Sequence, residues 1–281
     1  MEKFKLCAFA DEASNHLSGQ IAALQRNGIA FLEIRGINGK NIKDVNACEA
    51  KEIKKALNDA DISVWSIGSP IGKIATDGDM QTHFDDFKRI LETADLLDAK
   101  HIRLFSFFPA VGEEPEKTKE IVFMQTEKLL SLTPAHIILC HENEKDIFGE
   151  NAENCLALHQ AFPRLRAVFD PANFVQCGVD TKAAWELLKD YVEYMHIKDA
   201  VSDGTVVPAG MGLGNVPSIV SDYLLRGGEV MTLEPHLFDF TGLSALENGN
   251  MKSLGISPYR DNDEAFDAAA NALKKILNQI K

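Results

Sequence analysis

The sequence predicts a closed (β/α)8 TIM barrel that forms one domain over residues 1–281. Eight apolar or β-branched runs of strand length alternate with eight segments of helical periodicity, which is the pattern of such a barrel. With 281 residues and 45% hydrophobic composition, the chain can also bury one large core, and these barrels commonly use about 250 residues. An open, doubly wound sheet is the alternative that the same alternation allows.

Each expected strand is a short run rich in aliphatic and aromatic residues. In chain order the strands are Lys5–Ala10, Ala30–Ile34, Ser63–Ile67, His101–Phe105, His136–Cys140, Arg166–Phe169, Val192–Ile197 and Glu229–Leu233. The helices expected between and after them are His16–Asn27, Asp44–Asp59, Thr82–Leu97, Pro115–Ser131, Asn151–Phe162, Thr181–Leu188, Val216–Leu225 and Asp263–Ile280. Two long, turn-rich segments, Gly68–Gly78 and Phe238–Arg260, are expected to be active-site loops because loops carry the chemistry of barrels.

Charge and cysteine usage restrict the class of partner. The chain has 29 basic and 42 acidic residues and a net charge of −13, which disfavours a nucleic-acid partner and favours a small ligand. Five widely spaced cysteines form no CxxC pair, so neither a disulfide framework nor a zinc ribbon is indicated. The sequence shows no signal peptide and no apolar run of membrane-spanning length. We therefore expect a cytoplasmic protein with reduced thiols and no membrane partner.

Four residues of metal-ligand type stand at the ends of apolar runs. Glu142, Asp170, His196 and Glu234 end or follow the runs IILCHE, LRAVFD, VEYMHI and VMTLEP. Each residue alone has an ordinary structural explanation, such as a turn or a hydrogen-bonded core group. Together, at one mouth of a parallel barrel, three carboxylates and one imidazole are a ligand set for a divalent cation such as Mn²⁺, Mg²⁺, Co²⁺ or Zn²⁺. The pattern predicts a metal-dependent enzyme.

Alternation along the strands indicates which neighbours share the barrel interior with these residues. Lys198 lies two residues after His196, and His236 lies two residues after Glu234, so each pair shares a face. Lys198 is expected either to contact the ligand or to form a salt bridge with a carboxylate at the rim. His236 is expected to approach the site. On the early strands, Arg103 is expected to orient substrate hydroxyls or to pair with Glu33.

Several of these motifs together resemble a known superfamily. The strand ends HENE, FDPANF, HIKDA and TLEP, with the turn PAGMGLG, resemble the xylose-isomerase-like barrels. This group of sugar isomerases and epimerases includes tagatose/psicose 3-epimerases, inosose isomerases and dehydratases, and endonuclease IV. The resemblance extends from FADEAS to the last helix. It implies one bound ion, Mn²⁺ before Mg²⁺, Co²⁺ or Zn²⁺, held by Glu142, Asp170, His196 and Glu234, and a chain that can form homo-oligomers.

The resemblance also implies a reaction. Glu142 and Glu234 would act as an acid/base pair on either side of a sugar or polyol, with the metal stabilising an ene-diolate. Return of the proton to the opposite face gives epimerisation, and return to the adjacent carbon gives isomerisation. Loss of a β-hydroxyl gives dehydration of the keto-inositol type, which is the alternative reading. An endonuclease-like activity and a ligand-binding role without turnover are weaker alternatives.

Two departures from the ketose 3-epimerases leave the substrate and its phosphorylation open. The position three residues after Asp170 is Asn173 where those enzymes carry histidine, and Ser202 stands where they carry arginine. Asn173 is expected to hydrogen-bond a substrate hydroxyl, as its amide can donate and accept. The turn PAGMGLGNV is also compatible with a phosphate cradle, although a lone GxGxG is weak evidence.

Overall fold

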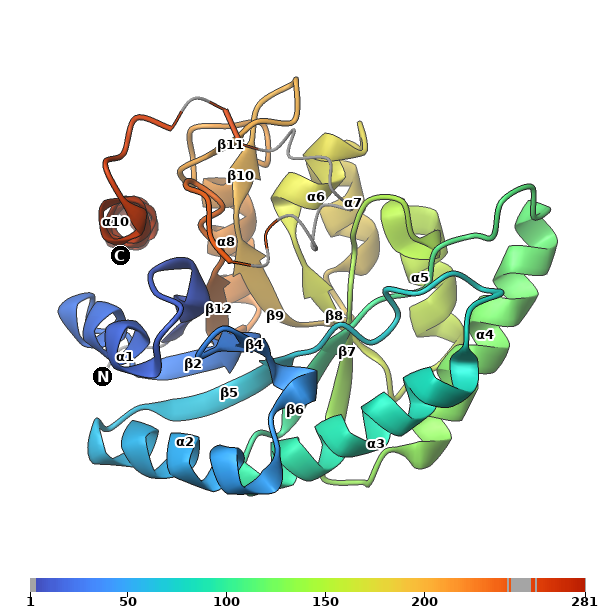
Figure 1. Cartoon of the computed structure of the whole chain (residues 1–281). Helices are drawn as coiled ribbons and strands as arrows, with labels where there is room; N and C mark the ends of the chain where they lie inside the picture. Colours follow the sequence, from blue (N-terminus) through green and yellow to red (C-terminus); the bar gives the residue numbers. More distant parts are fainter. Residues whose placement is uncertain (1–3, 242, 244–253, 256, 281) are drawn as a thin grey trace.

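The computed structural model describes residues 4–241, 243, 254–255 and 257–280 and contains a closed parallel barrel (Figure 1). Around the barrel the strands follow the order β1-β12-β9-β8-β7-β6-β5-β2, so the first strand closes the barrel against the last. Their bounds are β1 Lys5–Ala8, β2 Phe31–Ile34, β5 Ser63–Gly68, β6 His101–Leu104, β7 Ile138–Glu142, β8 Arg166–Phe169, β9 Val192–Ile197 and β12 Val230–Leu233. The barrel predicted from the sequence is confirmed.

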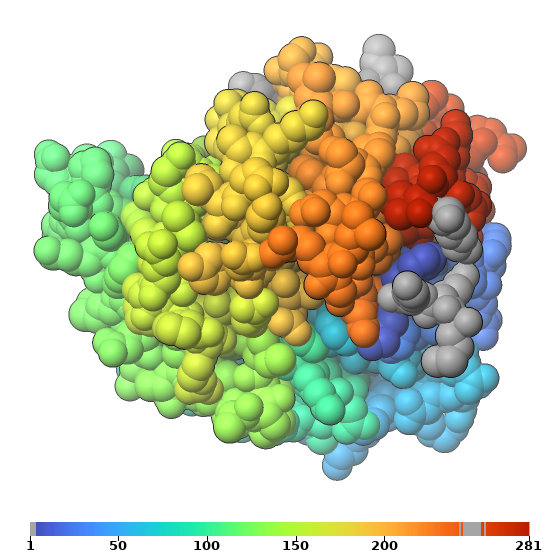
Figure 2. Space-filling view, turned by 180° about the vertical axis from the view of Figure 1, so that it is seen from behind, coloured from blue at the N-terminus to red at the C-terminus, as the bar shows by residue number. Residues whose placement is uncertain are grey.

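Helices surround the barrel and connect successive strands (Figure 1). Their bounds are α1 Leu17–Arg26, α2 Ala47–Asp59, α3 Met80–Leu96, α4 Pro115–Leu132, α5 Ala152–Ala161, α6 Pro171–Gln176, α7 Thr181–Leu188, α8 Val216–Leu225 and α10 Asn262–Ile280. Helix α10, red in Figure 2, lies beside the blue N-terminal part of the chain, where Arg26 pairs with Asp263 and Asp267. No helix in the described part of the chain is both long and apolar enough to cross a membrane.

Apolar side chains form two separate cores. The larger one fills the space between the outer face of the barrel and the helices, and includes Leu32, Met195 and Phe266. The smaller one lies on the inward-facing positions of the strands and includes Tyr194 and Val168. Because side chains alternate along each strand, the next inward positions towards the carboxyl ends remain for polar groups. The site residues occupy those positions.

Two strands differ from the prediction by two residues, and β2, β5, β6 and β12 differ by one residue at one end. The fifth strand of the barrel was expected at His136–Cys140 but is β7 at Ile138–Glu142, because Ile137 still closes a turn on Pro134. Glu142 is therefore the last strand residue. The first strand was expected to reach Ala10 but ends at Ala8, and Ala10–Glu12 forms a 3-10 turn instead.

Short elements after the strands were not predicted. Strands β3 Gly36–Ile37 and β4 Lys40–Asn41 form a hairpin whose two turn residues, Asn38 and Gly39, have φ of 50° and 76°. These are the dihedrals of a type I′ turn, for which Asn-Gly is a favoured sequence. A second hairpin joins β10 Asp199–Ala200 to β11 Val206–Val207. Further 3-10 turns span Ile42–Asp44 and Phe148–Glu150.

Candidate metal centre

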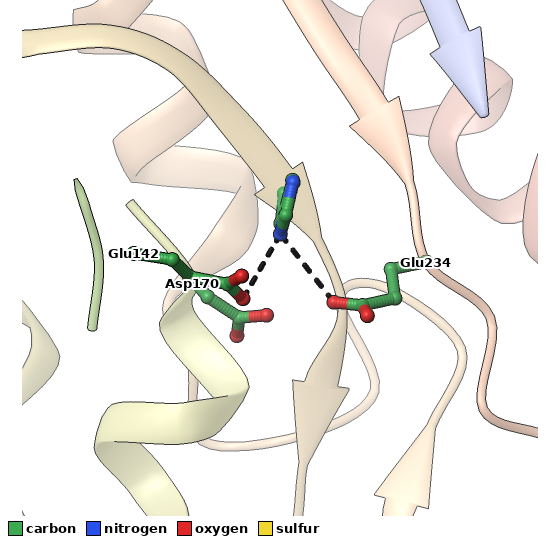
Figure 3. A group of neighbouring side chains, drawn as sticks. Glu142, Asp170 and Glu234 are labelled. Atoms are coloured by element: carbon green, nitrogen blue, oxygen red, sulfur yellow. Dashed lines mark hydrogen bonds and ion pairs between the residues drawn. The ribbon is translucent and has the colours of Figure 1, made fainter. Parts of the chain in front are cut away.

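The four residues predicted as metal ligands converge at the mouth of the barrel. Glu142 ends β7, Asp170 follows β8, His196 lies in β9 and Glu234 follows β12. All four are buried, and one potential ligand atom from each lies within 4.8 Å of those of the others. In Figure 3 the Glu142 and Glu234 carboxylates approach the centre from opposite sides, with Asp170 beside Glu142. The cluster can therefore hold a divalent cation.

Asp170 is positioned by the start of a helix. Pro171 occupies the first turn of α6, and the Asp170 side chain caps that helix by accepting a hydrogen bond from the Asn173 backbone N–H at 2.9 Å. Proline is favoured at this position because its missing N–H has no helical partner there, and aspartate is a preferred N-cap. The sequence DPAN thus fixes one carboxylate oxygen and leaves the other, Oδ2, directed into the cluster.

His196 is held by carboxylates at both ring nitrogens. Its Nδ1 lies 3.0 Å from Glu142 Oε1 and 3.5 Å from Glu234 Oε2, whereas Nε2 lies 3.1 Å from Glu33 Oε2. Burial alone lowers the pKa of His196, but the charges of Glu142 and Glu33 outweigh it and hold this pKa well above its usual value. Tyr194 donates a 2.7 Å hydrogen bond to the other Glu33 oxygen. Glu33 therefore orients the imidazole from behind, as carboxylates commonly do for metal-ligating histidines.

Lys198 forms ion pairs inside the cluster. Its Nζ lies 3.0 Å from Asp170 Oδ2 and 3.0 Å from Glu234 Oε2, and the side chain is buried. Burial raises the pKa of Asp170, Lys198 lowers it and neighbouring carboxylates raise it further, to about 7. Burial also raises the pKa of Glu234, but Lys198 and His236 outweigh it and hold this pKa well below the usual range. The predicted pairing of Lys198 with a rim carboxylate is present.

Two buried arginines extend the cluster towards the early strands. Arg35 Nη1 lies 3.0 Å from Glu234 Oε1, and the same guanidinium contacts Asp11 at 3.0 Å. Arg103 Nε lies 3.2 Å from Glu142 Oε2. The sequence had suggested that Arg103 pairs with Glu33, but the side-chain hydrogen bonds of Glu33 go to His196 and Tyr194. The alternation of side chains along the early strands placed Arg103 inside the barrel, but no local sequence signal indicates contacts across it.

The two other residues expected to bind substrate, Asn173 and His236, lie against the proposed ligands. Asn173 Nδ2 donates to Glu142 Oε1 at 3.2 Å and to the Asn143 carbonyl at 2.9 Å, so it orients Glu142. His236 Nε2 lies 3.4 Å from both Glu234 and Glu12. Burial and the charge of Lys198 lower the pKa of His236 to about 4, which keeps this imidazole neutral near pH 7.

Glu12, Glu234 and His236 form a second group with the donor types of a metal site. Arg35 already supplies the positive charge that this group needs, because its guanidinium lies 3.0 Å from Glu12 Oε1 and 3.0 Å from Glu234 Oε1. The four-residue cluster fits a divalent ion better. Its Asp170 Oδ2 is fully buried and forms the 3.0 Å ion pair with Lys198, but within the described residues it accepts no hydrogen bond. A buried carboxylate oxygen in this condition is stabilised by a cation.

The glycine turn is not a phosphate cradle in this structure. Its amides are occupied by the side chain of Asp199, which accepts hydrogen bonds from Gly210 at 2.9 Å, Gly212 at 3.0 Å and Gly214 at 2.8 Å. A Cβ at Gly212 would lie 2.4 Å from Asp199 Oδ1, so the close approach requires glycine. Ser202, at the position of the epimerase arginine, is exposed.

A cavity of about 420 Å³ opens beside the cluster. Most of its lining comes from the early connections, above all the β3–β4 hairpin and the segment after β5, and the segment after the last strand, β12, also contributes. Gly68 and Lys73 belong to the predicted loop Gly68–Gly78, and Phe240 belongs to the predicted loop Phe238–Arg260. Residues 242, 244–253 and 256 of the latter lie outside the described residues. Both predicted loops contribute to the cavity.

Solved structures with this fold include proteins of several activities. An IolI protein with a bound zinc atom superposes with a TM-score of 0.75 at 14% identity, covering 99% of each chain. D-Psicose 3-epimerase from Clostridium cellulolyticum H10, solved with D-tagatose, gives 0.73 at 13% identity and covers 99% of this chain and 100% of its own. The probable 3-DHS dehydratase AsbF from Bacillus anthracis gives 0.69 at 15%, covering 96% and 98%. These likenesses show the shared fold.

No curated protein sequence matches the chain significantly. The sequence does match a family of barrels over residues 21–236, a range that contains all four residues of the cluster. This range is more than half of the 281 residues, and it agrees with the closed barrel described above. The chain belongs to the xylose isomerase-like TIM barrel family.

Proposed function

We propose that this protein is a divalent-metal-dependent isomerase or epimerase that acts on a sugar or polyol. The observation that carries the proposal is the buried cluster of Glu142, Asp170, His196 and Glu234, with ligand atoms within 4.8 Å of one another. The ion is Mn²⁺ first, with Mg²⁺, Co²⁺ and Zn²⁺ as substitutes, because carboxylate-rich sites accept several divalent ions. Epimerases among proteins of similar fold support the proposal.

The bound ion would polarise the substrate carbonyl and stabilise the negative charge that develops when a neighbouring C–H loses its proton. Glu142 and Glu234 supply the proton transfers. They reach the centre from opposite sides, so one removes the proton from one face of the carbon and the other returns a proton to the opposite face (Figure 3). The low pKa of Glu234, held down against burial by Lys198 and His236, keeps it ionised as the base.

Dehydration of a keto-inositol type of substrate is the second candidate, and Lys198 favours it. Elimination of a β-hydroxyl needs an acid near the leaving oxygen. Lys198 is buried between Asp170 and Glu234, whose charges outweigh burial and hold its pKa well above the usual value. The ammonium therefore stays charged near pH 7 and would stabilise negative charge on the leaving oxygen by a hydrogen bond. The same fold in a probable dehydratase, AsbF, supports this candidate too.

Deuterium exchange tests the proposal. The protein is loaded with Mn²⁺ and incubated in D₂O with a panel of ketoses and inososes, and products are analysed by NMR and mass spectrometry. We expect deuterium at a carbon next to the carbonyl. Glu142→Gln and Glu234→Gln each lower the exchange rate about 10³-fold, the usual contribution of a general acid or base. Conservation of mass identifies isomers, and loss of one water identifies dehydration.

Glu229→Gln is the matched control, because Glu229 immediately precedes β12 at the opposite end of the barrel and pairs with Lys5 at the surface. This variant should exchange at the rate of the unsubstituted protein. Full exchange in both Glu142→Gln and Glu234→Gln would refute the acid/base assignment. Absence of exchange with every substrate, with metal binding established by calorimetry, would refute the enzymatic proposal and favour ligand binding alone.

A further inference from the structure

The cavity beside the metal centre has a composition opposite to that of the protein. The chain has 42 acidic and 29 basic residues, whereas the cavity is lined by five basic side chains and the single acidic Asp11. From a composition of 29 in 281, the seventeen lining residues would include about two basic ones. The five are Arg35, Lys40, Lys43, Lys73 and Arg103. This concentration requires an explanation beyond composition.

The carboxylates that pair with these cations do not line the cavity, with the exception of Asp11. Arg103 pairs with Glu142, and Lys73 pairs with Glu144 at 3.0 Å, but neither glutamate is part of the lining. Asp11 itself is held by Arg35 through two hydrogen bonds of 3.0 and 3.1 Å. The lining therefore contains more basic than acidic residues, and most of the carboxylates that pair with the cations lie outside it. An anion entering the cavity meets positive charge first.

Aromatic rings fix the directions of the cations. The Arg35 guanidinium lies 4.3 Å from the Phe9 ring centre and 4.9 Å from that of Phe240. Arg103 lies 4.4 Å and Lys73 4.6 Å from the Phe105 ring centre. Cation–π contacts of this kind restrict the positions of Arg35, Arg103 and Lys73, so these three donors are preorganised. Phe105 and Phe240 also line the cavity and offer apolar faces to a carbon skeleton.

The walls are also fixed by backbone hydrogen bonds. The segment after β6 is tied to the segment after β5, because Phe105 N donates to the Ile71 carbonyl at 2.8 Å and Phe107 N donates to the Gly72 carbonyl at 2.9 Å. The Gly72 N–H donates to His83 Nε2 at 2.9 Å. A preformed cavity of about 420 Å³ is of the size that binds small molecules.

The arginines join this cavity to the metal centre. Arg35 contacts Glu234, and Arg103 contacts Glu142, so a ligand whose carbonyl lies at the centre extends into the cavity. We propose that the substrate carries an anionic group, a carboxylate or a phosphate, which binds in this cavity between Arg103 and the lysines Lys40, Lys43 and Lys73. This inference rests on the proposed function for the identity of the reacting end, and it narrows the substrate class to acidic or phosphorylated sugars.

Calorimetric titration of the full chain tests the anion site without turnover. The protein is treated with EDTA, which is then removed by dialysis, and is titrated with inorganic phosphate, with D-gluconate and with neutral D-glucitol. We expect one of the anions to bind and glucitol to bind at least about tenfold more weakly. Binding of phosphate alone assigns a phosphorylated substrate, and binding of gluconate alone assigns a carboxylate. Equal affinity for the anions and glucitol would overturn the inference.

Two double variants isolate the cavity lysines from general charge effects. Lys40 and Lys43 are partly exposed and pair with surface carboxylates, so replacing both with Gln leaves the fold intact. We expect K40Q/K43Q to bind the anion about fivefold more weakly. The control K54Q/K55Q removes the same charge from helix α2 outside the cavity and should bind normally. Equal losses in both double variants would contradict a specific site.

The two proposals can fail separately. Anion binding that depends on Lys40 and Lys43, combined with no deuterium exchange, would refute the enzymatic function and leave the anion site established. Deuterium exchange that is at least as fast with a neutral ketose as with its phosphate and its sugar acid, combined with no anion binding, would establish the enzyme and refute the anion site.

Discussion

The two halves of the barrel mouth carry opposite charge. The later strands β7, β8, β9 and β12 supply the carboxylates and the imidazole of the candidate metal centre. The connections after the early strands β2 and β5, with Arg103 of β6, supply the cations of the cavity. Arg35 and Arg103 join the halves through Glu234 and Glu142. Under the two proposals, one half holds a cation and the other an anion, which is the arrangement expected for a substrate with a reactive carbonyl and a charged tail.

The largest effect is expected from removing a ligand on the metal side. Asp170→Asn deletes a charge from the cluster while the amide oxygen can still cap α6. We expect Mn²⁺ affinity to fall by more than about 100-fold, because loss of an outer partner alone usually costs 10- to 100-fold. Isothermal calorimetry measures it, with the exposed Asp59→Asn as control. Unchanged affinity in Asp170→Asn would remove Asp170 from the ligand set.

A smaller effect on the same side is expected from Glu33, which acts through His196. Glu33→Gln keeps the shape but lowers the strength of the acceptor at Nε2. Mn²⁺ affinity should fall by about 10- to 100-fold, while the far-UV circular dichroism stays unchanged. Tyr194→Phe removes the hydrogen bond to the other Glu33 oxygen, together with the 3.1 Å contact to Ser66 Oγ, but leaves the Glu33–His196 pair intact and should cost less. If Glu33→Gln binds metal normally, the imidazole is oriented by strand packing alone.

A third prediction concerns His159, which lies in helix α5 outside the barrel, in contrast to His196 inside the barrel. His159 of α5 packs against His141, and burial lowers the pKa of His159 to about 4. This folded-state pKa is below the unfolded value of about 6.5, so protons bind preferentially to the unfolded chain. Stability should therefore be complete above pH 6.5 and fall as the pH decreases towards 4. Between pH 6.5 and 5.5 the loss due to His159 is about 1 kcal/mol.

Urea unfolding at a series of pH values measures this loss. His159→Gln should show a smaller dependence on pH than the unsubstituted protein, by the same amount and over the same interval. Parallel pH profiles for the two proteins would mean that His159 takes up its proton equally in the folded and unfolded chains.

The smallest effect is expected from the salt concentration, which should weaken ligand binding more at the exposed lysines of the cavity than at the buried metal centre. Lys40 and Lys43 are partly exposed, whereas the metal-centre side chains are buried. Raising NaCl from about 50 to about 200 mM should weaken phosphate binding about twofold, because screening acts mainly on exposed charges. Affinity for Mn²⁺ should change less. Calorimetry at both salt concentrations measures the difference, and equal sensitivity of the two sites would contradict the distinction.

The metal half could be predicted from the sequence, and the cation half mostly could not. Glu142, Asp170, His196 and Glu234 each lie at or just after the end of an apolar strand, so barrel closure alone places them together. Strand boundaries shifted by two residues at β7 without moving Glu142 away from the mouth. Local sequence patterns were sufficient to predict this half, because the position of each ligand is set by the strand that carries it.

The cavity depends on contacts that local patterns do not contain. Lys40 reaches it through the β3–β4 hairpin, and the Asn38-Gly39 pair was the signal that could have revealed that turn. The DPAN sequence could likewise have revealed the start of α6 at Pro171. The partnership of Arg35 with Glu234 has no such signal, because it joins residues that meet only when the barrel closes.

The span of these contacts has a consequence for how the protein is made. Arg35 and Glu234 are separated by 199 residues, and Glu33 and His196 by 163. During synthesis Arg35 and Glu33 emerge from the ribosome long before Glu234 and His196, their partners from the later strands. The site is therefore assembled only after β12 docks between β9 and β1, and contacts of such long range make this closure slow relative to helix formation. A chain that stops before residue 234 contains most of the barrel strands but lacks Glu234. It therefore cannot form the complete cluster.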